Sequence, residues 1–224
     1  MTAEYRSLTT GQARTCDGKA DEPVVIVVDD DELMRSALRR LFASSGLVAE
    51  IHASGVEFLA QARLDRPSCI ILDACMPGLS GLEVQACLKQ RRVEIPLIFL
   101  TGSSDIPIAV SAMREGAVDF IEKPFDNADL VARVRQAIDR HRHVRQEHLE
   151  RQDVARKLKS LTPRECSVLD LLVTGKTNKE IARLLGASHR TIEVHRRHIM
   201  EKMTALTLAG LVRMRLLATN EDAS

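Results

Sequence analysis

Between residues 24 and 140, short apolar runs alternate with longer stretches in which apolar residues recur every three or four positions. The short runs predict strands and the longer period predicts amphipathic helices. The predicted strands are Val24–Val28, Val48–His52, Cys69–Leu72, Leu97–Leu100 and Val118–Ile121. Five such strand–helix units predict an α/β fold with a doubly wound, five-stranded parallel sheet, for which we expect the strand order 2-1-3-4-5.

The helical period continues beyond Asp126 without Gly or Pro until Pro163, and most residues in the middle of this stretch are charged. The candidate seam positions are Val144, Leu149, Val154 and Leu158. So sparse an apolar seam favours a solvated linker helix over residues 141–160, with a coiled coil as the alternative.

The last part of the chain has only helical patterns. Thr162 with Glu165, and Thr177 with Glu180, are capping-box patterns that predict where helices begin, as Ser54 with Glu57 does earlier in the chain. A turn at Gly186 then separates two helices. This arrangement is typical of a helix-turn-helix.

The second helix of this pair, which opens near Ser188, has two different faces. At 100° per residue, Ile192, Ile199 and Met203 share the face that we expect to pack inward. The opposite face carries Arg190, Val194, Arg197 and Glu201, flanked by Glu193 and His198. Val194 is an apolar side chain on a polar face, as contact with a thymine methyl group requires.

Composition supports two domains with different partners. The chain has 224 residues and is 45% hydrophobic, enough to bury two small cores. Residues 24–140 contain thirteen Lys and Arg against seventeen Asp and Glu, whereas residues 141–224 contain sixteen against ten and six of the seven histidines. A small basic domain after an acidic one favours nucleic acid as the partner of the second.

No stretch approaches the roughly 18 consecutive apolar residues of a membrane span, and residues 1–23 lack the apolar segment of a secretory signal. We interpret residues 1–23 as a disordered tail and residues 219–224 as a second tail. Five cysteines without CxxC spacing argue against a disulfide framework and a zinc site. The expectation is a cytoplasmic protein with no membrane partner.

Polar residues stand where the predicted strands end: Asp29 and Asp30, Asp73, Thr101 and, just past the fifth strand, Lys123. Ligands of open α/β sheets bind beyond the carboxyl ends of the strands, where the strand order reverses, so these side chains should converge. Three carboxylates in one pocket require a cation, and oxygen ligands without His or Cys favour Mg²⁺.

In the stretch IILDACMPG an apolar run ends on Asp73, where packing alone requires no acid. The rigid Met76-Pro77-Gly78 turn that follows keeps Asp73 at the pocket. With Lys123 and Mg²⁺ to neutralise charge, the set suggests in-line phosphoryl transfer to Asp73. Taken singly, these residues have simpler interpretations, such as a helix cap for the Asp-rich stretch VVDDDE, and only their joint placement favours the chemical one.

The motifs VVDDDE, LDACMPG, LTG and AVDFIEKPF resemble those of the receiver domain of bacterial two-component response regulators. The resemblance implies a flavodoxin-like domain in which Asp73 accepts a phosphoryl group from a sensor histidine kinase. It also implies that Asp29 and Asp30 hold Mg²⁺ together with Asp73.

The same resemblance makes Thr101 the switch hydroxyl, Lys123 the phosphoryl-binding lysine and Phe120 the switch aromatic, and it implies a cis peptide bond before Pro124. Two features depart from the family pattern. Cys75 stands where relatives often carry Arg, and GSSD follows Thr101 where they often have GHGD. In the family these neighbours line the path of the hydrolytic water, so the lifetime of the phosphorylated form is open.

The strings LTPRE, GKTNKEIA, RTIEVHR and LVRM resemble the four-helix, all-α output domain of the LuxR type, and the whole chain is similar to the NarL/FixJ regulators, the FixJ branch in particular. The resemblance implies base contacts by Glu193, Val194 and Arg197. It implies phosphate contacts by Asn178, Lys179, Ser188, Arg190 and Thr191. A phosphorylation-dependent homodimer would then bind double-stranded DNA and, with RNA polymerase as a further partner, regulate transcription.

The predicted organisation is a receiver domain at 24–140, a helical linker at 141–160 and a DNA-binding domain at 161–218. The receiver would catalyse only its own phosphorylation and dephosphorylation, so the protein would not be an enzyme. An aspartyl-phosphate hydrolase is an alternative, although such enzymes carry a second acid where this chain has Cys75. A phosphorylation-independent DNA-binding regulator is another, against which the intact acid, hydroxyl and lysine set speaks.

Overall fold

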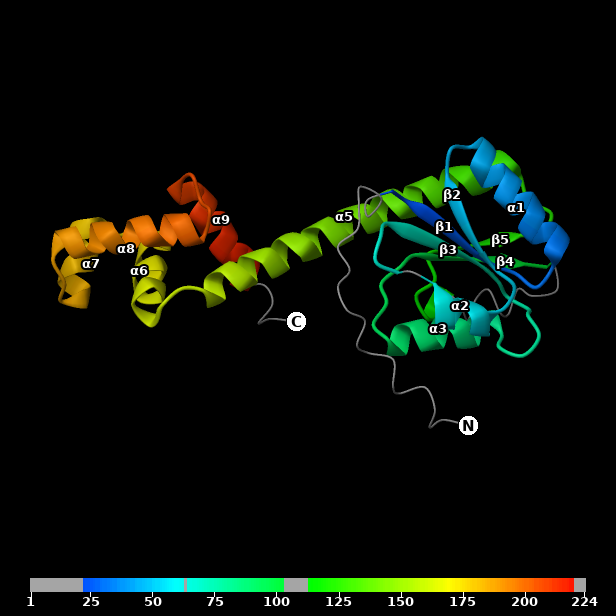
Figure 1. The fold of residues 1–224 in the computed structure, drawn as a ribbon, viewed down its shortest axis with the longest axis horizontal. Helices are drawn as coiled ribbons and strands as arrows, with labels where there is room; N and C mark the ends of the chain where they lie inside the picture. Colours follow the sequence, from blue (N-terminus) through cyan, green and yellow to red (C-terminus); the bar gives the residue numbers. More distant parts are fainter. Residues whose placement is uncertain (1–21, 63, 103–112, 220–224) are drawn as a thin grey trace. The chain divides into compact units, whose positions relative to one another are not determined.

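The computed structural model describes residues 22–62, 64–102 and 113–219 (Figure 1). The chain divides into two compact units, with the boundary between His143 and Val144. Residues 1–21 and 220–224, which make up most of the two predicted tails, lie outside the described residues. The predicted domain boundaries remain predictions. Within the described ranges, no helix combines the length and the apolar character needed to cross a membrane.

The first unit is built on a five-stranded sheet in which all neighbouring strands are parallel, in the order β2-β1-β3-β4-β5. This confirms the predicted fold class and strand order. The strands are β1 (Val24–Val28), β2 (Val48–His52), β3 (Ser68–Asp73), β4 (Leu97–Thr101) and β5 (Asp119–Glu122). β3 includes Asp73, beyond the apolar run, because Asp73 still pairs with Leu100 of β4. Backbone pairing, not side-chain polarity, ends the strand.

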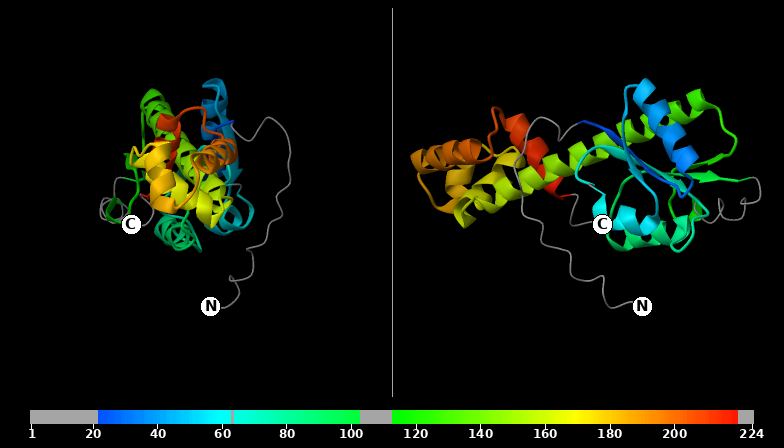
Figure 2. Two further views of the ribbon diagram at one scale, coloured as in Figure 1. Left: turned by 90° about the vertical axis from the view of Figure 1, so that its left-hand side faces the viewer. Right: turned by 45° about the vertical axis from the view of Figure 1, so that its right-hand side comes forward.

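Helices cover both faces of this sheet (Figures 1 and 2). Helices α1 (Glu32–Ser44) and α5 (Asn127–Lys159) pack on one face, and α2 (Gly55–Gln61) and α3 (Gly81–Gln90) pack on the other. In β1, Val25 and Val27 pack in the core under α1 and α5. Val24, Ile26 and Val28 pack in the core under α2 and α3 on the other face. A strand buried on both sides explains the uninterrupted apolar run in the sequence.

The second unit is helical, with α6 (Pro163–Val173), α7 (Asn178–Leu185), α8 (His189–Lys202) and α9 (Leu208–Thr219). Ile192 and Ile199 of α8 and Met203, its C-cap, are fully buried in the core of this unit, which confirms the predicted inward face. Both predicted capping boxes of this unit are present. Gly186 ends α7 with φ of 61°, a left-handed conformation that suits glycine, and Ser188 caps α8.

Two local predictions differ from the structure. Glu57 of α2 does not complete a capping box with Ser54, because its carboxylate accepts the N–H of Ala53 instead. The predicted linker segment lies in α5 up to Lys159 and most of its side chains are exposed, but two of them are buried. His141 is buried in the first unit, where its Nδ1 lies 3.0 Å from the backbone N of Ser68, and Val154 is buried in the core of the second unit.

Candidate functional site

Two buried carboxylates and one lysine meet at the carboxyl end of the sheet. Lys123 Nζ lies 2.6 Å from Asp73 Oδ1 and 3.1 Å from Asp29 Oδ2. Asp29 is 1% exposed and Asp73 is 8% exposed. They come together because β1 and β3 are neighbouring parallel strands whose carboxyl ends meet at one edge of the sheet.

Asp29 is held at every polar group. Its Oδ1 accepts the N–H of Asp31 at 2.8 Å, its own N–H donates to the carbonyl of His52 at 3.3 Å, and its carbonyl accepts Nη1 of Arg35 at 2.8 Å. No pattern in the sequence singled out Arg35. The available signal is its position three residues after Glu32, the first residue of α1, which brings its side chain back over the end of β1.

The consecutive residues Asp29, Asp30 and Asp31 have different roles. Asp31 is the N-cap of α1, and its side chain accepts from the N–H groups of Leu33 and Met34. The simpler interpretation of the Asp-rich stretch is therefore correct for Asp31. Because Asp31 supplies the cap, Asp29 and the exposed Asp30 do not have to.

Asp73 is fixed by its neighbours in the chain and by α3. The backbone N–H of Cys75 donates to Asp73 Oδ2 at 3.1 Å. Gly81, the first residue of α3, packs against the strand end so closely that an added Cβ would lie 2.5 Å from the carbonyl oxygen of Asp73 and 2.8 Å from the ring of Phe99. Only glycine permits this approach, so Gly81 is a residue of the site that the sequence did not reveal.

Burial and charge set the protonation of the site. Burial raises the pKa of Asp73, as does the charge of Asp29, and the hydrogen bond from Lys123 only partly opposes this, so the pKa of Asp73 lies above its ordinary value. Burial lowers the pKa of Lys123, but Asp73 and Asp29 outweigh it, so the pKa of Lys123 is raised. The lysine is thus a firmly protonated cation shared by two carboxylates.

The other predicted residues of the first unit lie on β4 and β5 or just after them. Thr101 is buried at the end of β4, and its carbonyl accepts the N–H of Lys123 at 2.8 Å. Phe120 on β5 is 44% exposed. The peptide bond between Lys123 and Pro124 is cis, which confirms that expectation. The predicted departure GSSD falls on residues 102–105, of which 103–105 lie outside the described residues.

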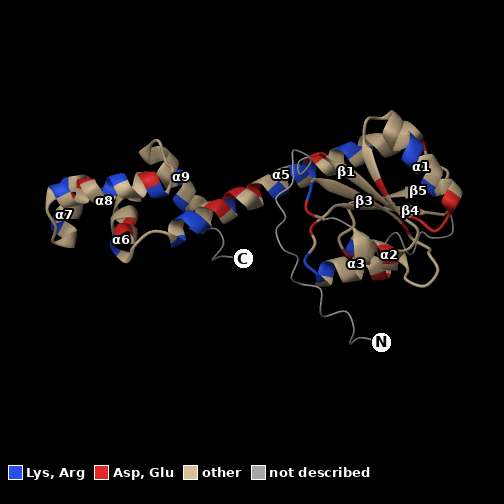
Figure 3. Ribbon diagram, viewed as in Figure 1, with Lys and Arg blue, Asp and Glu red and all other residues tan. Residues whose placement is uncertain are grey.

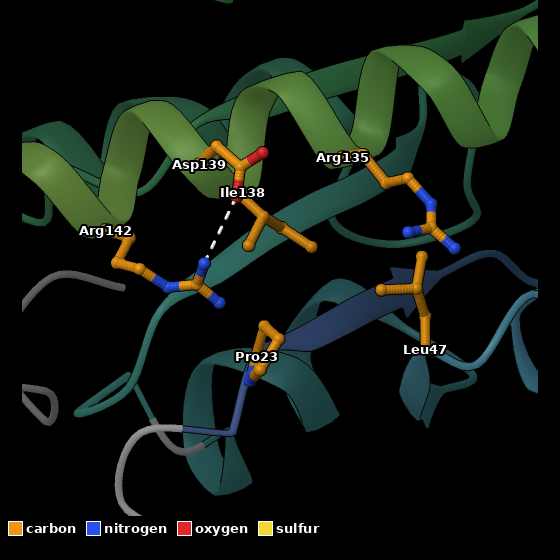
Figure 4. A pocket seen from close by; sticks show the side chains of 6 residues that line it. All are labelled: Pro23, Leu47, Arg135, Ile138, Asp139 and Arg142. Atoms are coloured by element: carbon orange, nitrogen blue, oxygen red, sulfur yellow. Dashed lines mark hydrogen bonds and ion pairs between the residues drawn. The ribbon is translucent and has the colours of Figure 1, made fainter.

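Among the described residues, no three His, Cys, Asp or Glu side chains gather as a metal site would require. A shallow pocket opens at the opposite end of the sheet, beside the residues that precede β1 and β2 (Figure 4). It is lined by Pro23, Leu47, Arg135, Ile138, Asp139 and Arg142. Because Pro23 and Leu47 precede their strands, whereas the carboxylates follow theirs, this pocket has no part in the site.

In the second unit the predicted DNA contacts lie on α7, on α8 and at the N-cap of α8. The exposed members are Lys179, Ser188, Arg190, Thr191, Glu193, Val194 and Arg197. Figure 3 shows Lys and Arg along both helices. Asn178 is half-buried, and its Oδ1 accepts Nη1 of Arg196 at 3.3 Å. The sequence did not single out Arg196.

Comparison with known proteins agrees with this division. Residues 25–135 match the model of the response regulator receiver domain, and residues 159–215 match that of the LuxR family of bacterial regulatory proteins. The chain is 46% identical to the transcriptional regulatory protein FixJ of Azorhizobium caulinodans, over 87% of this chain and 92% of that protein.

Two solved structures are also similar. The response regulator StyR has a TM-score of 0.81 and 38% identity, over 86% of this chain and 98% of that one. Full-length FixJ from B. japonicum has a TM-score of 0.54 and 36% identity, over 89% of this chain and 98% of that one. The likeness therefore extends over both units of the chain.

Proposed function

The chain belongs to the FixJ-like response regulators, which combine a receiver with a LuxR-type DNA-binding domain, and from this premise we propose how its own residues act. Asp73 accepts a phosphoryl group from a sensor histidine kinase, and this modification controls dimerisation and sequence-specific binding of DNA by the second unit. The observation that carries the proposal is the contact of Lys123 with both Asp73 and Asp29.

The transfer breaks the bond between phosphorus and the nitrogen of the kinase histidine and forms a bond between phosphorus and a carboxylate oxygen of Asp73. Lys123, protonated and already within 2.6 Å of Asp73, neutralises charge on the phosphoryl oxygens. Cys75 orients the carboxylate through its backbone N–H. The receiver catalyses only its own phosphorylation and dephosphorylation, and a multiple-turnover release of phosphate from small esters would instead support a hydrolase.

Asp29, Asp30 and Asp73 are the residues that would hold Mg²⁺. The fit rests on charge and donor type: two buried carboxylates share one ammonium group, the pKa of Asp73 is raised, and all the available donors are oxygens. When bound, Mg²⁺ would further neutralise the phosphoryl group. Asp30→Asn should weaken Mg²⁺ binding without disturbing the cap at Asp31.

The switch runs from Thr101 to Phe120. Thr101 moves toward the new phosphoryl oxygens, and Phe120, whose ring is exposed in this structure, turns into the space that is vacated. β4, which ends at Thr101, and β5, which carries Phe120, are hydrogen-bonded neighbours with Thr101 opposite Glu122. A shift of one strand therefore displaces the other. The surface that includes β5 and α5 then becomes the face of a homodimer.

In the second unit, base contacts come from Glu193, Val194 and Arg197, and these set the sequence preference. Phosphate contacts come from Asn178, Lys179, Ser188, Arg190 and Thr191, and these set the position on the duplex. The dimer binds paired half-sites in the cytoplasm and acts there with RNA polymerase.

The test is selection of duplexes from a random pool by the full chain, with and without a small phosphodonor and Mg²⁺, at fixed salt. Phosphodonor should enrich a paired motif with the unmodified chain but not with Asp73→Asn. Asp139→Asn, which removes an exposed carboxylate of the same unit, is the control and should behave like the unmodified chain. Equal enrichment by Asp73→Asn would remove Asp73 from the control of DNA binding.

A further inference from the structure

We propose that Arg196 is a positioning residue for DNA binding, which holds the side-chain amide of Asn178 with its NH₂ group directed to a DNA phosphate. The inference rests on the proposed DNA-binding function of the second unit. It concerns a residue whose neighbours on α8, Val194 and Arg197, lie on the base-facing surface.

Arg196 leaves α8 in a different direction from those neighbours. At 100° per residue it lies 100° from Arg197 and 200° from Val194 around the helix. It is half-buried, whereas both neighbours are exposed. Its Nη1 donates to Oδ1 of Asn178, the first residue of α7, at 3.3 Å. The side chain of Arg196 therefore reaches from α8 to the first residue of α7.

The chemistry of the two side chains fixes which way the amide faces. A guanidinium has only donors, so the acceptor Oδ1 of Asn178 must face Arg196, and a flipped amide would bring NH₂ against the cation. A phosphate oxygen has only acceptor capacity, so Asn178 can bind it only through NH₂. Arg196 thus stabilises the one orientation that leaves the NH₂ group for phosphate.

The start of α7 does not need the Asn178 side chain for its own stability. The hydroxyl of Thr177 accepts the N–H of Glu180, and the carboxylate of Glu180 accepts the N–H of Thr177 at 2.8 Å. This capping box satisfies the groups that an Asn side chain could otherwise serve. The Asn178 side chain is therefore not required for capping, and its contact with Arg196 can serve DNA binding.

The experiment is a double-mutant cycle in the full chain with Arg196→Met, Asn178→Ala and both together. The probes are the duplex that the unmodified chain enriches and a random-sequence duplex of equal length, measured over a range of salt. Each single substitution should weaken binding to both probes about tenfold, the worth of one good hydrogen bond. The double variant should bind no more weakly than Asn178→Ala, because Arg196 acts through Asn178.

Two controls separate positioning from other roles. Arg196→Lys, which keeps the charge and one donor nitrogen, should recover part of the affinity, and Arg213→Met, which removes an exposed charge from α9, should leave affinity unchanged. The base preference of Arg196→Met should equal that of the unmodified chain.

Additive losses, or a salt slope lowered by about one in Arg196→Met, would mean that Arg196 itself contacts phosphate, and would overturn the inference. Loss of amide protection in α7 and α8 would make Arg196 a structural residue and overturn it too. If the unmodified chain selects no duplex, the proposed function fails and the inference fails with it. If that chain selects a duplex and Arg196→Met binds it equally well, the inference alone fails.

Discussion

The two units of this protein assemble their functional surfaces in opposite ways. The carboxylate site of Asp29, Asp73 and Lys123 joins residues that are far apart in sequence: Lys123 contacts one partner 50 positions away and another 94 positions away. The candidate DNA surface lies within the single stretch from Asn178 to Arg197, on two helices joined by a short turn. The first surface depends on the packing of a whole sheet, whereas the second depends mainly on where two helices begin and end.

This contrast indicates how each surface should fail. A substitution that disturbs the packing of a helix on the sheet should distort the carboxylate site even when it removes no functional group. The DNA surface should be sensitive to caps and to single contacts between neighbouring helices.

The largest effect should follow Lys123→Met, which leaves Asp29 and Asp73 without their shared cation. Phosphoryl acceptance from a small phosphodonor with Mg²⁺ should fall about 10²- to 10³-fold, because charge on the transferred group loses its preorganised partner. Incorporation of acid-labile phosphate over time measures it. Lys89→Met, which removes a cation from an exposed ion pair, is the matched control and should keep the normal rate. Normal phosphorylation of Lys123→Met would show that the carboxylate site does not need the lysine for phosphoryl transfer.

Gly81→Ala tests whether the packing of α3 on the sheet sets the geometry of the carboxylate site. The added methyl group would overlap the carbonyl oxygen of Asp73 and the ring of Phe99, so the first unit should lose about 3 kcal/mol, the upper end for overpacking. Hydrogen exchange of the amides in each unit, followed in urea, resolves the change.

The control for Gly81→Ala is Gly210→Ala in α9, where the nearest atom to the added Cβ is 3.4 Å away. That substitution should be neutral or stabilise the second unit by up to about 1 kcal/mol, since alanine favours a helix. Equal losses for the two variants would contradict the role given to Gly81.

A smaller, pH-dependent effect should come from Glu165 in the second unit. Burial raises the pKa of Glu165, but Lys202 at 2.7 Å and the hydrogen bonds from Thr162 outweigh it and lower this pKa to about 2. A lowered pKa means that the stabilisation is complete above the ordinary value of 4.5 and is lost as the pH falls from there to about 2.

Glu165→Gln should therefore destabilise the second unit by about 2 kcal/mol at pH 6 and by much less at pH 2, compared with the unmodified chain at the same pH. Unit-resolved hydrogen exchange between pH 6 and pH 2 measures the difference. A difference that stays constant over this range would mean that the ion pair with Lys202 contributes nothing to the folded state.

The smallest effect should follow Thr177→Ala, which removes the cap of α7. The second unit should lose about 1 kcal/mol and the first unit nothing, because the capping box is a local structure. The same exchange measurement reports both units at once. A loss of stability in the first unit would contradict the local character assigned to the second surface.

Much of the site could be predicted because the needed signals are local. Acids after apolar runs marked the strand ends, and the parallel order of the strands then required Asp29 and Asp73 to meet. The Thr and Glu pairs of the capping boxes likewise located the starts of α6 and α7. Gly81 and Arg196 could not be predicted, because each acts on a segment brought near only by folding.

By itself, the sequence determined the alternation of strands and helices, the caps of the DNA-binding helices and the set of residue types available for phosphoryl transfer. These follow from hydrophobic periodicity and from hydrogen bonds between residues a few positions apart. Only the tertiary structure decided that Asp29 faces Lys123, that Gly81 must lack a side chain and that Arg196 turns toward Asn178. Those choices depend on distances across packed elements, and such distances exist only after the sheet and the helices have come together.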